Sequence, residues 1–271
     1  MPIKVRKSIS NLQTYNVGGR SDLSSDWECF DWNESEFPPT NKVFEVMKSF
    51  YRYERYPDIT AKQLKNKLSE YVSLPVDFIE VYNGSDDALK DIITVFVDKD
   101  TKVLSYQPSY TQVNTFITTN TEHYEKINIQ DPLGEHHYDF DYCKSADVVY
   151  LVNPNNPTGK LLPVKEIEKL VKQYPNTLFI VDEAYYEFAK QSCTHLVVSH
   201  KNLIVTRTFS KAFGLASVRL GYCMAHPDTL SDVRKIRNGK AVNALGQLCG
   251  IAALNDLDLS LIHISEPTRL V

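Results

Sequence analysis

The feature that most constrains the fold is an alternation of short, apolar, β-rich runs with helical patterns. VVYLV (148–152) and LFIVD (178–182) are almost continuously apolar, which is typical of strands buried on both faces of a sheet. Between them, PVKEIEKLVKQY spaces its apolar residues as a helix does, and Pro163 suits a first helical turn. This alternation predicts an α/β fold with a mostly parallel central sheet.

The same alternation extends over most of the chain. Four more strands are predicted, at FIEVYN (78–83), KVLSY (102–106), LIVTRT (203–208) and RLGYCMA (219–225). Helices are predicted in GSDDALKDIITVFV and from Ser109 onward. The first 40 residues show little periodicity, so we expect an N-terminal arm or small-domain segment over 1–40 and one large domain over 41–258.

The end of the chain differs from the rest. LSLIHISEPTR (259–269) matches, residue for residue, the translation of a common transposase sequencing adapter. We therefore predict that 259–271 is a non-native, adapter-derived tail; a short terminal strand is the alternative.

Charge and cysteine usage exclude several classes of function. The net charge of −4 argues against nucleic acid as the main partner, although a local basic pocket for a small anion remains compatible with it. No apolar run approaches the length of a membrane span, and no apolar segment follows the basic N-terminus as in a secretory signal. The five cysteines are scattered and include no CxxC pair, which predicts free thiols in a reducing, cytoplasmic setting. His136–His137 is a lone pair without a further ligand at metal spacing, so no metal site is predicted.

Polar residues follow several of the predicted strands. In this architecture ligands bind outside the carboxyl ends of strands. Ser85 and Asp86 stand at a strand-to-helix turn, where they could bind a phosphate or simply cap the helix. Asp182 ends a buried strand, so a cation or a protonated ring nitrogen is expected beside it. Lys211 supplies an amine that could form a Schiff base with a carbonyl compound.

The order of these motifs carries a resemblance. GSD (84–86), PSY (108–110), NPNNPTG (153–159), DEAY (182–185) and SKxxG from Ser210 resemble the motifs of the fold type I pyridoxal-phosphate aminotransferases. Within them the chain is most similar to the histidinol-phosphate aminotransferase family, from about Ile3 to Asp258. That similarity rests on an opening pattern with Leu12, Tyr15 and Arg20, on WNES (32–35), on RYPD (55–58) and on RTFSKAFGLAS.

The resemblance implies roles for individual residues around pyridoxal phosphate. Lys211 would hold the cofactor as a Schiff base and then move a proton between the substrate Cα and the cofactor C4′. Asp182 would pair with the pyridinium nitrogen and keep it protonated. Asn156 and Tyr185 would hydrogen-bond the phenolic oxygen of the ring, and Tyr110 would stack on the ring face.

It also implies a phosphate site and a dimer. The cofactor phosphate would be bound by the hydroxyls and guanidinium of Thr208, Ser210 and Arg219 and by the amides and side chains of Ser85 and Asp86. Tyr56, in RYPD, would reach the cofactor phosphate of the neighbouring subunit, so a homodimer is expected. Tyr15, Asn33 and Glu34 would contact the substrate; for Asn33 and Glu34 the alternative is the cap of a turn.

The implied reaction is ping-pong transamination between histidinol phosphate and 2-oxoglutarate, in histidine biosynthesis. Related enzymes decarboxylate amino-acid phosphates or transaminate aromatic amino acids, and these reactions stay open as alternatives, as does a non-catalytic module or inactive fragment. The resemblance further implies that a small C-terminal domain is largely missing from the chain. We therefore expect the helix GQLCGIAALNDL (246–257) to lack its packing partners.

Overall fold

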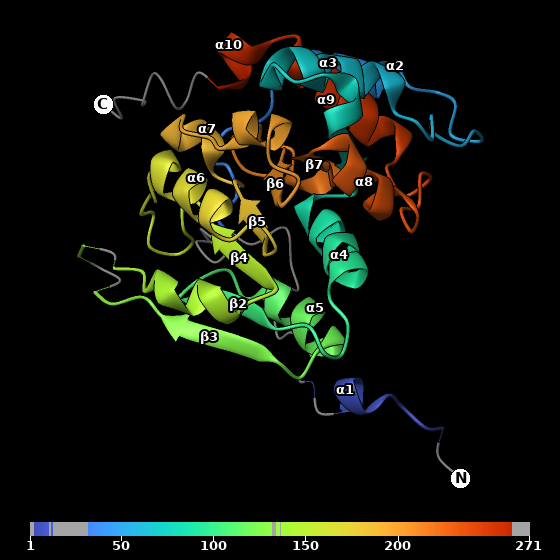
Figure 1. Ribbon diagram of the computed structural model, residues 1–271. Helices are drawn as coiled ribbons and strands as arrows, with labels where there is room; N and C mark the ends of the chain where they lie inside the picture. Colours follow the sequence, from blue (N-terminus) through green and yellow to red (C-terminus); the bar gives the residue numbers. More distant parts are fainter. Residues whose placement is uncertain (1–2, 11, 13–31, 132–133, 136, 262–271) are drawn as a thin grey trace.

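A seven-stranded sheet forms the centre of the computed structural model, which describes residues 3–10, 12, 32–131, 134–135 and 137–261. The strand order is β1-β7-β6-β5-β4-β2-β3 (Figure 1). The strands are β1 (Ile79–Tyr82), β2 (Val103–Gln107), β3 (Tyr124–Asn128), β4 (Val148–Val152), β5 (Leu178–Asp182), β6 (Leu203–Thr208) and β7 (Gly221–Ala225).

Strand direction sets the edge at which loops and side chains meet. Strands β2 to β6 pair in parallel, whereas β7 runs antiparallel to both of its neighbours, β6 and β1. Gly221, the first residue of β7, is therefore paired with Thr208 and Tyr82, the last residues of β6 and β1. Every residue of β1, β4, β6 and β7 is buried, as are the last four residues of β5. For β4 and β5 this burial is what their apolar runs predict.

Helices cover both faces of the sheet. The longer ones are α2 (Asn41–Ser49), α3 (Lys62–Val72), α4 (Ser85–Phe96), α5 (Gln112–Asn120), α6 (Val164–Gln173), α8 (Pro227–Arg234) and α9 (Ala244–Leu254). Short turns of helix are α1 (Lys7–Ser10), α7 (Tyr186–Ala189) and α10 (Leu257–Ser260). Buried residues of α4, α5 and α8 form one apolar core with the sheet, and those of α2, α3, α6 and α9 form the other.

The helix expected to lack packing partners is covered. Seven residues of α9 are buried, and α9 contacts both α2 and α3; the three helices gather at one end of the molecule (Figure 1). The hydroxyl of Thr40, just before α2, donates a hydrogen bond to the carboxylate of Asp256, just after α9. The expectation was wrong because it left out these two helices, which precede the first strand in sequence.

The predicted strands are confirmed to within one or two residues, and the structure adds one. The edge strand β3 was not predicted, because YEKIN is largely exposed and carries no continuous apolar run. The helix expected from Ser109 begins at Gln112, and Pro163 occupies the N-cap of α6 instead of its first turn. Tyr15, Trp27, His136 and 262–271 lie outside the described residues, and the boundaries of 1–40, 41–258 and 259–271 stay predictions.

Within the described part of the chain, no helix is both long and apolar enough to cross a membrane.

Candidate active site

A cavity of about 720 Å³ lies at the carboxyl ends of the parallel strands. Its lining includes Val152, Asp182 and Thr208, which are the last residues of β4, β5 and β6. Twelve of the side chains predicted from sequence to form the site also line it: Asn33, Glu34, Ser85, Asp86, Tyr110, Asn156, Asp182, Tyr185, Thr208, Ser210, Lys211 and Arg219. Four strand-to-helix connections, the connection between β6 and β7, and the segment before α2 thus converge on one place.

Lys211 follows β6 and projects into this cavity. Burial of its side chain lowers the pKa of the amine, and the nearby carboxylates of Glu34 and Asp86 act in the opposite direction. The Nζ atom donates a hydrogen bond to the backbone oxygen of Trp32 and lies 5.9 Å from the centre of the Tyr185 ring. A lowered pKa enlarges the fraction of neutral, nucleophilic amine, which Schiff-base chemistry requires.

Asp182 is a buried carboxylate with a neutral hydrogen-bond shell. It is 3% exposed and accepts hydrogen bonds from the Tyr150 hydroxyl at 2.9 Å and from the amide of Ala184 at 3.1 Å. Burial raises its pKa to about 6, although the bond from Tyr150 acts to lower it. Among the described residues no lysine, arginine or histidine forms an ion pair with it, so the cation expected from sequence is not a side chain of that part of the chain.

Three other lining residues, Thr208, Ser210 and Arg219, carry donors and a cation suited to an anion. The Ser210 amide donates to the Thr208 hydroxyl at 3.1 Å, and the two hydroxyls are 3.0 Å apart. Arg219 points one guanidinium nitrogen at the Ser210 hydroxyl, 3.4 Å away. The same guanidinium packs on the turn before α4, since a Cβ placed on Gly84 would lie 2.7 Å from it. Hydroxyls, a guanidinium and the N-terminus of a helix together favour a phosphate.

The turn before α4 comes close enough to the sheet to require glycine. A Cβ on Gly221 would lie 2.4 Å from the amide nitrogen of Ser85, a distance that no side chain can occupy. The antiparallel strand β7 therefore brings its first residue directly against the first residue of α4. This contact fixes the helix N-terminus relative to Thr208, the pairing partner of Gly221.

The predicted role of Asp86 as a side-chain ligand of the phosphate stays a prediction, and its carboxylate has other partners in the structure. Its carboxylate accepts a hydrogen bond from the Tyr110 hydroxyl at 2.8 Å and lies 3.9 Å from the Arg219 guanidinium. A carboxylate repels a phosphate, so the groups of this turn that suit an anion are the amides and the Ser85 hydroxyl. The Asp86 carboxylate instead holds Tyr110 and Arg219 in position.

Asn33 and Tyr185 form a contact that the sequence did not predict. The Asn33 amide donates to the Tyr185 hydroxyl at 2.8 Å, and burial raises the pKa of that phenol. Asn33 has a φ of 49°, a conformation in which asparagine is more readily found than most residues. A second cavity of about 340 Å³ shares Asn33, Glu34, Tyr185 and Lys211 with the first, so this segment lies between the two.

One predicted contact among the described residues, Tyr56, is not brought to this cavity. Tyr56 is 81% exposed and is not among the lining residues; the Nζ atom of Lys240 lies 5.1 Å from the centre of its ring. An exposed position is compatible with a role in a neighbouring subunit, which stays a prediction. Tyr15 lies outside the described residues.

Sequence reasoning missed a buried ion pair on the opposite face of the sheet. Arg207 donates from Nε and Nη2 to one carboxylate oxygen of Glu183 at 3.0 and 2.9 Å, and both side chains are at least 97% buried. The guanidinium also lies over the Tyr186 ring, 3.4 Å from its centre. Close by, burial raises the pKa of Glu187 to about 7. The available signal was that Glu183 follows Asp182 directly and that Arg207 stands between Thr206 and Thr208. Because strand residues alternate between faces, Glu183 and Arg207 are expected to point away from the face that carries their neighbours.

The arrangement fits pyridoxal phosphate. The buried carboxylate of Asp182 suits a protonated ring nitrogen, the hydroxyls of Thr208 and Ser210 and the guanidinium of Arg219 suit a phosphate, and the amine of Lys211 lies in the same cavity. In the part of the chain that the structure describes, no group of three or more histidine, cysteine, aspartate or glutamate side chains is placed to hold a metal ion.

Comparison with known proteins identifies relatives of this arrangement. The chain is 40% identical over 248 residues to a dihydroxyacetone phosphate transaminase of Campylobacter jejuni, covering 87% of this chain and 66% of the relative. It is 30% identical over 256 residues to a histidinol-phosphate aminotransferase of Geotalea daltonii, covering 94% and 73%. The chain thus spans about two thirds to three quarters of the length of these relatives.

Structural comparison agrees. The crystal structure of histidinol-phosphate aminotransferase from Sinorhizobium meliloti, in complex with pyridoxal-5'-phosphate, superposes with a TM-score of 0.79 at 27% identity, covering 86% of this chain and 65% of that one. Residues 23–266 match the family model for aminotransferase class I and II. The fold is therefore that of the fold type I pyridoxal-phosphate enzymes, and the chain belongs to the class I and II aminotransferase family.

Proposed function

We propose that this chain is the cofactor-binding part of a pyridoxal-phosphate-dependent aminotransferase in which Lys211 carries the cofactor. One observation supports this above all: Lys211, an amine of lowered pKa, and Asp182, a buried carboxylate, line the same cavity. Thr208, Ser210 and Arg219 supply the complementary anion site there.

Each residue has a proposed part in the reaction. When bound, pyridoxal phosphate would supply an electron-accepting ring that stabilises negative charge at the amino-bearing carbon of the substrate. Asp182 would hold a proton on the ring nitrogen, and Asn156 and Tyr185 would hydrogen-bond the phenolic oxygen of the ring. The neutral amine of Lys211 would take the proton from the amino-bearing carbon of the donor and pass it to the cofactor C4′; in the second half of the reaction it would carry a proton from C4′ to the carbon of the keto acid.

The remaining contacts position the cofactor and the substrate. Thr208, Ser210, Arg219, Ser85 and the amide of Asp86 would bind the phosphate, and Tyr110 would cover one face of the ring. Asn33 would orient Tyr185 through their hydrogen bond. Glu34 would contact the substrate beside Lys211.

The proposed substrate is a small phosphate monoester with an amino group, or a carbonyl, one carbon away from the ester carbon. Histidinol phosphate, with 2-oxoglutarate and glutamate as the other pair, is the first candidate, as the sequence motifs imply, and would place the protein in histidine biosynthesis. Dihydroxyacetone phosphate is the second, favoured by the 40% identity to the Campylobacter jejuni transaminase. The two differ at the remaining substituent, which is an imidazolylmethyl group in one and a hydroxymethyl group in the other.

We propose a homodimer in the cytoplasm as the working form. Tyr56 would then serve the phosphate site of the neighbouring subunit, which its exposure permits. The four cysteines in the described residues, Cys143, Cys193, Cys223 and Cys249, are buried free thiols, which fits a reducing compartment.

The test combines attachment and turnover. The complete gene product is incubated with pyridoxal phosphate and reduced with borohydride, and the modified peptide is mapped by mass spectrometry, with Lys211→Ala as the control. Attachment to Lys211, followed by glutamate formation from 2-oxoglutarate and histidinol phosphate, is the expected result. Faster turnover of glutamate with dihydroxyacetone phosphate selects the second substrate.

Three outcomes count against the proposal. Release of carbon dioxide from amino-acid phosphates without 2-oxoglutarate-dependent turnover would indicate a decarboxylase. Turnover of aromatic amino acids alone would indicate an aromatic aminotransferase. Absence of any attachment at Lys211 would indicate a non-catalytic module.

A further inference from the structure

The loop that carries Tyr56 is held firmly at its base while its tyrosine stays exposed. Asp58 accepts hydrogen bonds from the amides of Thr60 and Lys62 and thereby caps the start of α3; its bond from the Thr60 hydroxyl lowers the pKa of its carboxyl. Gln247, in α9, donates to the backbone oxygen of Asp58 at 3.0 Å. We call residues 55–59 the Tyr56 loop.

Residues 237–240 form a second support beneath this loop. Arg237 donates from Nη1 to the backbone oxygen of Ile59 at 3.4 Å. Gly239 packs so closely on the loop that an added Cβ would lie 3.0 Å from the same oxygen and 3.3 Å from the Ile59 Cβ. Lys240 places its ammonium near the exposed Tyr56 ring. The short segment therefore contacts both the base of the loop and its tyrosine.

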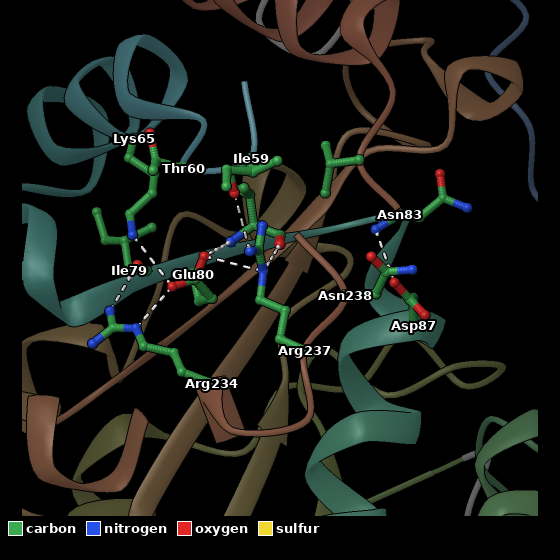
Figure 2. A network of polar contacts seen from close by, with 12 residues as sticks. Ile59, Thr60, Lys65, Ile79, Glu80, Asn83, Asp87, Arg234, Arg237 and Asn238 are labelled. Atoms are coloured by element: carbon green, nitrogen blue, oxygen red, sulfur yellow. Dashed lines mark hydrogen bonds and ion pairs between the residues drawn. The ribbon is translucent and has the colours of Figure 1, made fainter. Parts of the chain in front are cut away.

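Arg237 is in turn anchored in the core (Figure 2). Its Nε atom donates to the backbone oxygen of Val81 at 2.9 Å and lies 3.1 Å from the carboxylate of Glu80, and its side chain is only 10% exposed. Glu80, in β1, is 4% exposed and also pairs with Lys65 at 3.2 Å and Arg234 at 2.8 Å.

The three cations more than offset the burial of Glu80. Burial alone would raise the pKa of this carboxyl, but Arg237, Arg234 and Lys65 together hold it below its ordinary value. The carboxylate is thus charged at neutral pH and fixes the direction of the Arg237 side chain. A rigid connection runs from strand β1 through Glu80 and Arg237 to the backbone of the Tyr56 loop.

We propose that Arg237 is a positioning residue that holds Tyr56 where it can reach the cofactor phosphate in the neighbouring subunit. The proposal rests on the proposed function, in which Tyr56 serves that phosphate. Because Tyr56 is 81% exposed, little besides its own loop and Lys240 restrains its ring before a second subunit arrives. Arg237 should therefore act on the site of the partner and not on the cavity of its own chain.

The test separates these two subunits. Arg237→Lys retains a cation beside Glu80 but loses the planar fork that reaches both Val81 and Ile59. Homodimers of this variant should bind pyridoxal phosphate about tenfold more weakly than wild type, the effect of losing one charge-assisted hydrogen bond. Binding is read from the fraction of Lys211 that borohydride fixes at increasing cofactor concentration.

Hybrid dimers give the deciding measurement. Arg237→Lys subunits are paired with Lys211→Ala subunits by means of two affinity tags, so the one remaining Lys211 faces a Tyr56 whose own Arg237 is intact. Wild-type affinity in this hybrid is the expected result. Affinity as weak as in the Arg237→Lys homodimer would overturn the proposal, because Arg237 would then act within its own subunit.

Matched variants complete the design. Arg234→Lys also alters a partner of Glu80, but Arg234 bonds to the backbone of Asp77 instead of the Tyr56 loop, so its homodimer should bind like wild type. Gly239→Ala keeps Arg237 and Glu80 in place but puts a methyl group 3.0 Å from the Ile59 oxygen and 3.4 Å from Nη1 of Arg237. It should therefore displace the loop and show the same rescue in the hybrid, and it carries the test if Arg237→Lys does not fold.

Failure of the proposal and failure of the proposed function give different results. If wild type forms no bond at Lys211, the proposed function fails and this inference with it. If wild type attaches the cofactor but Tyr56→Phe binds it equally well, the proposed aminotransferase activity stands, but the role of Tyr56 at the phosphate, and with it the role of Arg237, is refuted.

Discussion

Replacing Asp182 with asparagine should stabilise the protein in the absence of pyridoxal phosphate. The carboxylate is 3% exposed and has no cationic partner among the described residues, so keeping it charged is costly. Asparagine is nearly isosteric. Its oxygen can accept from the Ala184 amide, and its nitrogen can donate to the Tyr150 hydroxyl, so both present partners keep a hydrogen bond.

The size of the gain follows from the pKa of Asp182. Burial raises it from 3.8 to about 6, so the folded state binds this proton more tightly than the unfolded state. Stability contributed by this group is therefore lost as pH rises from about 4 to about 6 and stays lost above. The cost is about 1.6 kcal/mol at about pH 5 and about 3 kcal/mol at about pH 7.5. Asp182→Asn should recover up to these amounts.

Urea unfolding at these two pH values, without cofactor, measures the effect. The difference between variant and wild type should grow by about 1.4 kcal/mol from the lower to the higher pH. Asp86→Asn is the control for removing one negative charge from the same cavity, and it should give no comparable gain because that carboxylate is partly exposed and lies beside Arg219. With pyridoxal phosphate present, wild type should gain more stability than Asp182→Asn. A pH-independent difference, or a less stable variant, would refute the reasoning.

Three more substitutions test the surroundings of the site. Glu183→Gln should lower the free energy of unfolding by about 3 to 5 kcal/mol, since it leaves the Arg207 guanidinium buried without its counter-ion; a loss below about 1 kcal/mol in a urea titration would contradict this. Gly221→Ala should weaken borohydride-fixed attachment of the cofactor and lower the melting temperature, because its methyl group would collide with the first amide of α4; unchanged values would show that the turn adjusts freely. Tyr150→Phe removes a hydrogen bond that lowers the pKa of Asp182, so the pH below which cofactor affinity falls should shift upward; an identical pH profile would exclude this coupling.

Much of the fold and of the cavity lining could be predicted because the relevant signals are local. Buried parallel strands such as VVYLV and LFIVD carry continuous apolar runs, and the polar residues that end them meet at one edge once the strands are parallel. That reasoning brings Asp182 and Thr208 together without any knowledge of distances. Lys211 lies three positions after Thr208, the last residue of β6, and so belongs to the connection that leaves the same edge of the sheet.

What the sequence could not supply are contacts between segments far apart in the chain. The bond from Asn33 to Tyr185 joins residues 152 positions apart, and nothing local in WNES indicates it. The packing of α9 on α2 and α3 was missed for the same reason, since amphipathic patterns say that a face is buried but not by what. The edge strand β3 was missed because exposed strands lose the apolar signal altogether.

The buried ion pair of Glu183 and Arg207 has a consequence for the register in which strands β5 and β6 pair. Asp182 in β5 is the pairing partner of Thr206 in β6. Glu183 and Arg207 are the next residues of the two segments, and their ion pair lies on the face of the sheet opposite the cavity. A shift of one residue between the two strands would turn Arg207 toward the cavity and leave Glu183 buried without its partner. Misaligned pairings of these strands are thus penalised by a charge left alone in the interior, and only the alignment that faces Asp182 toward the ligand escapes that penalty. The pair of Glu183 and Arg207 takes no part in the proposed chemistry, yet it favours the register of β5 and β6 that places Asp182 and Thr208 in the cavity.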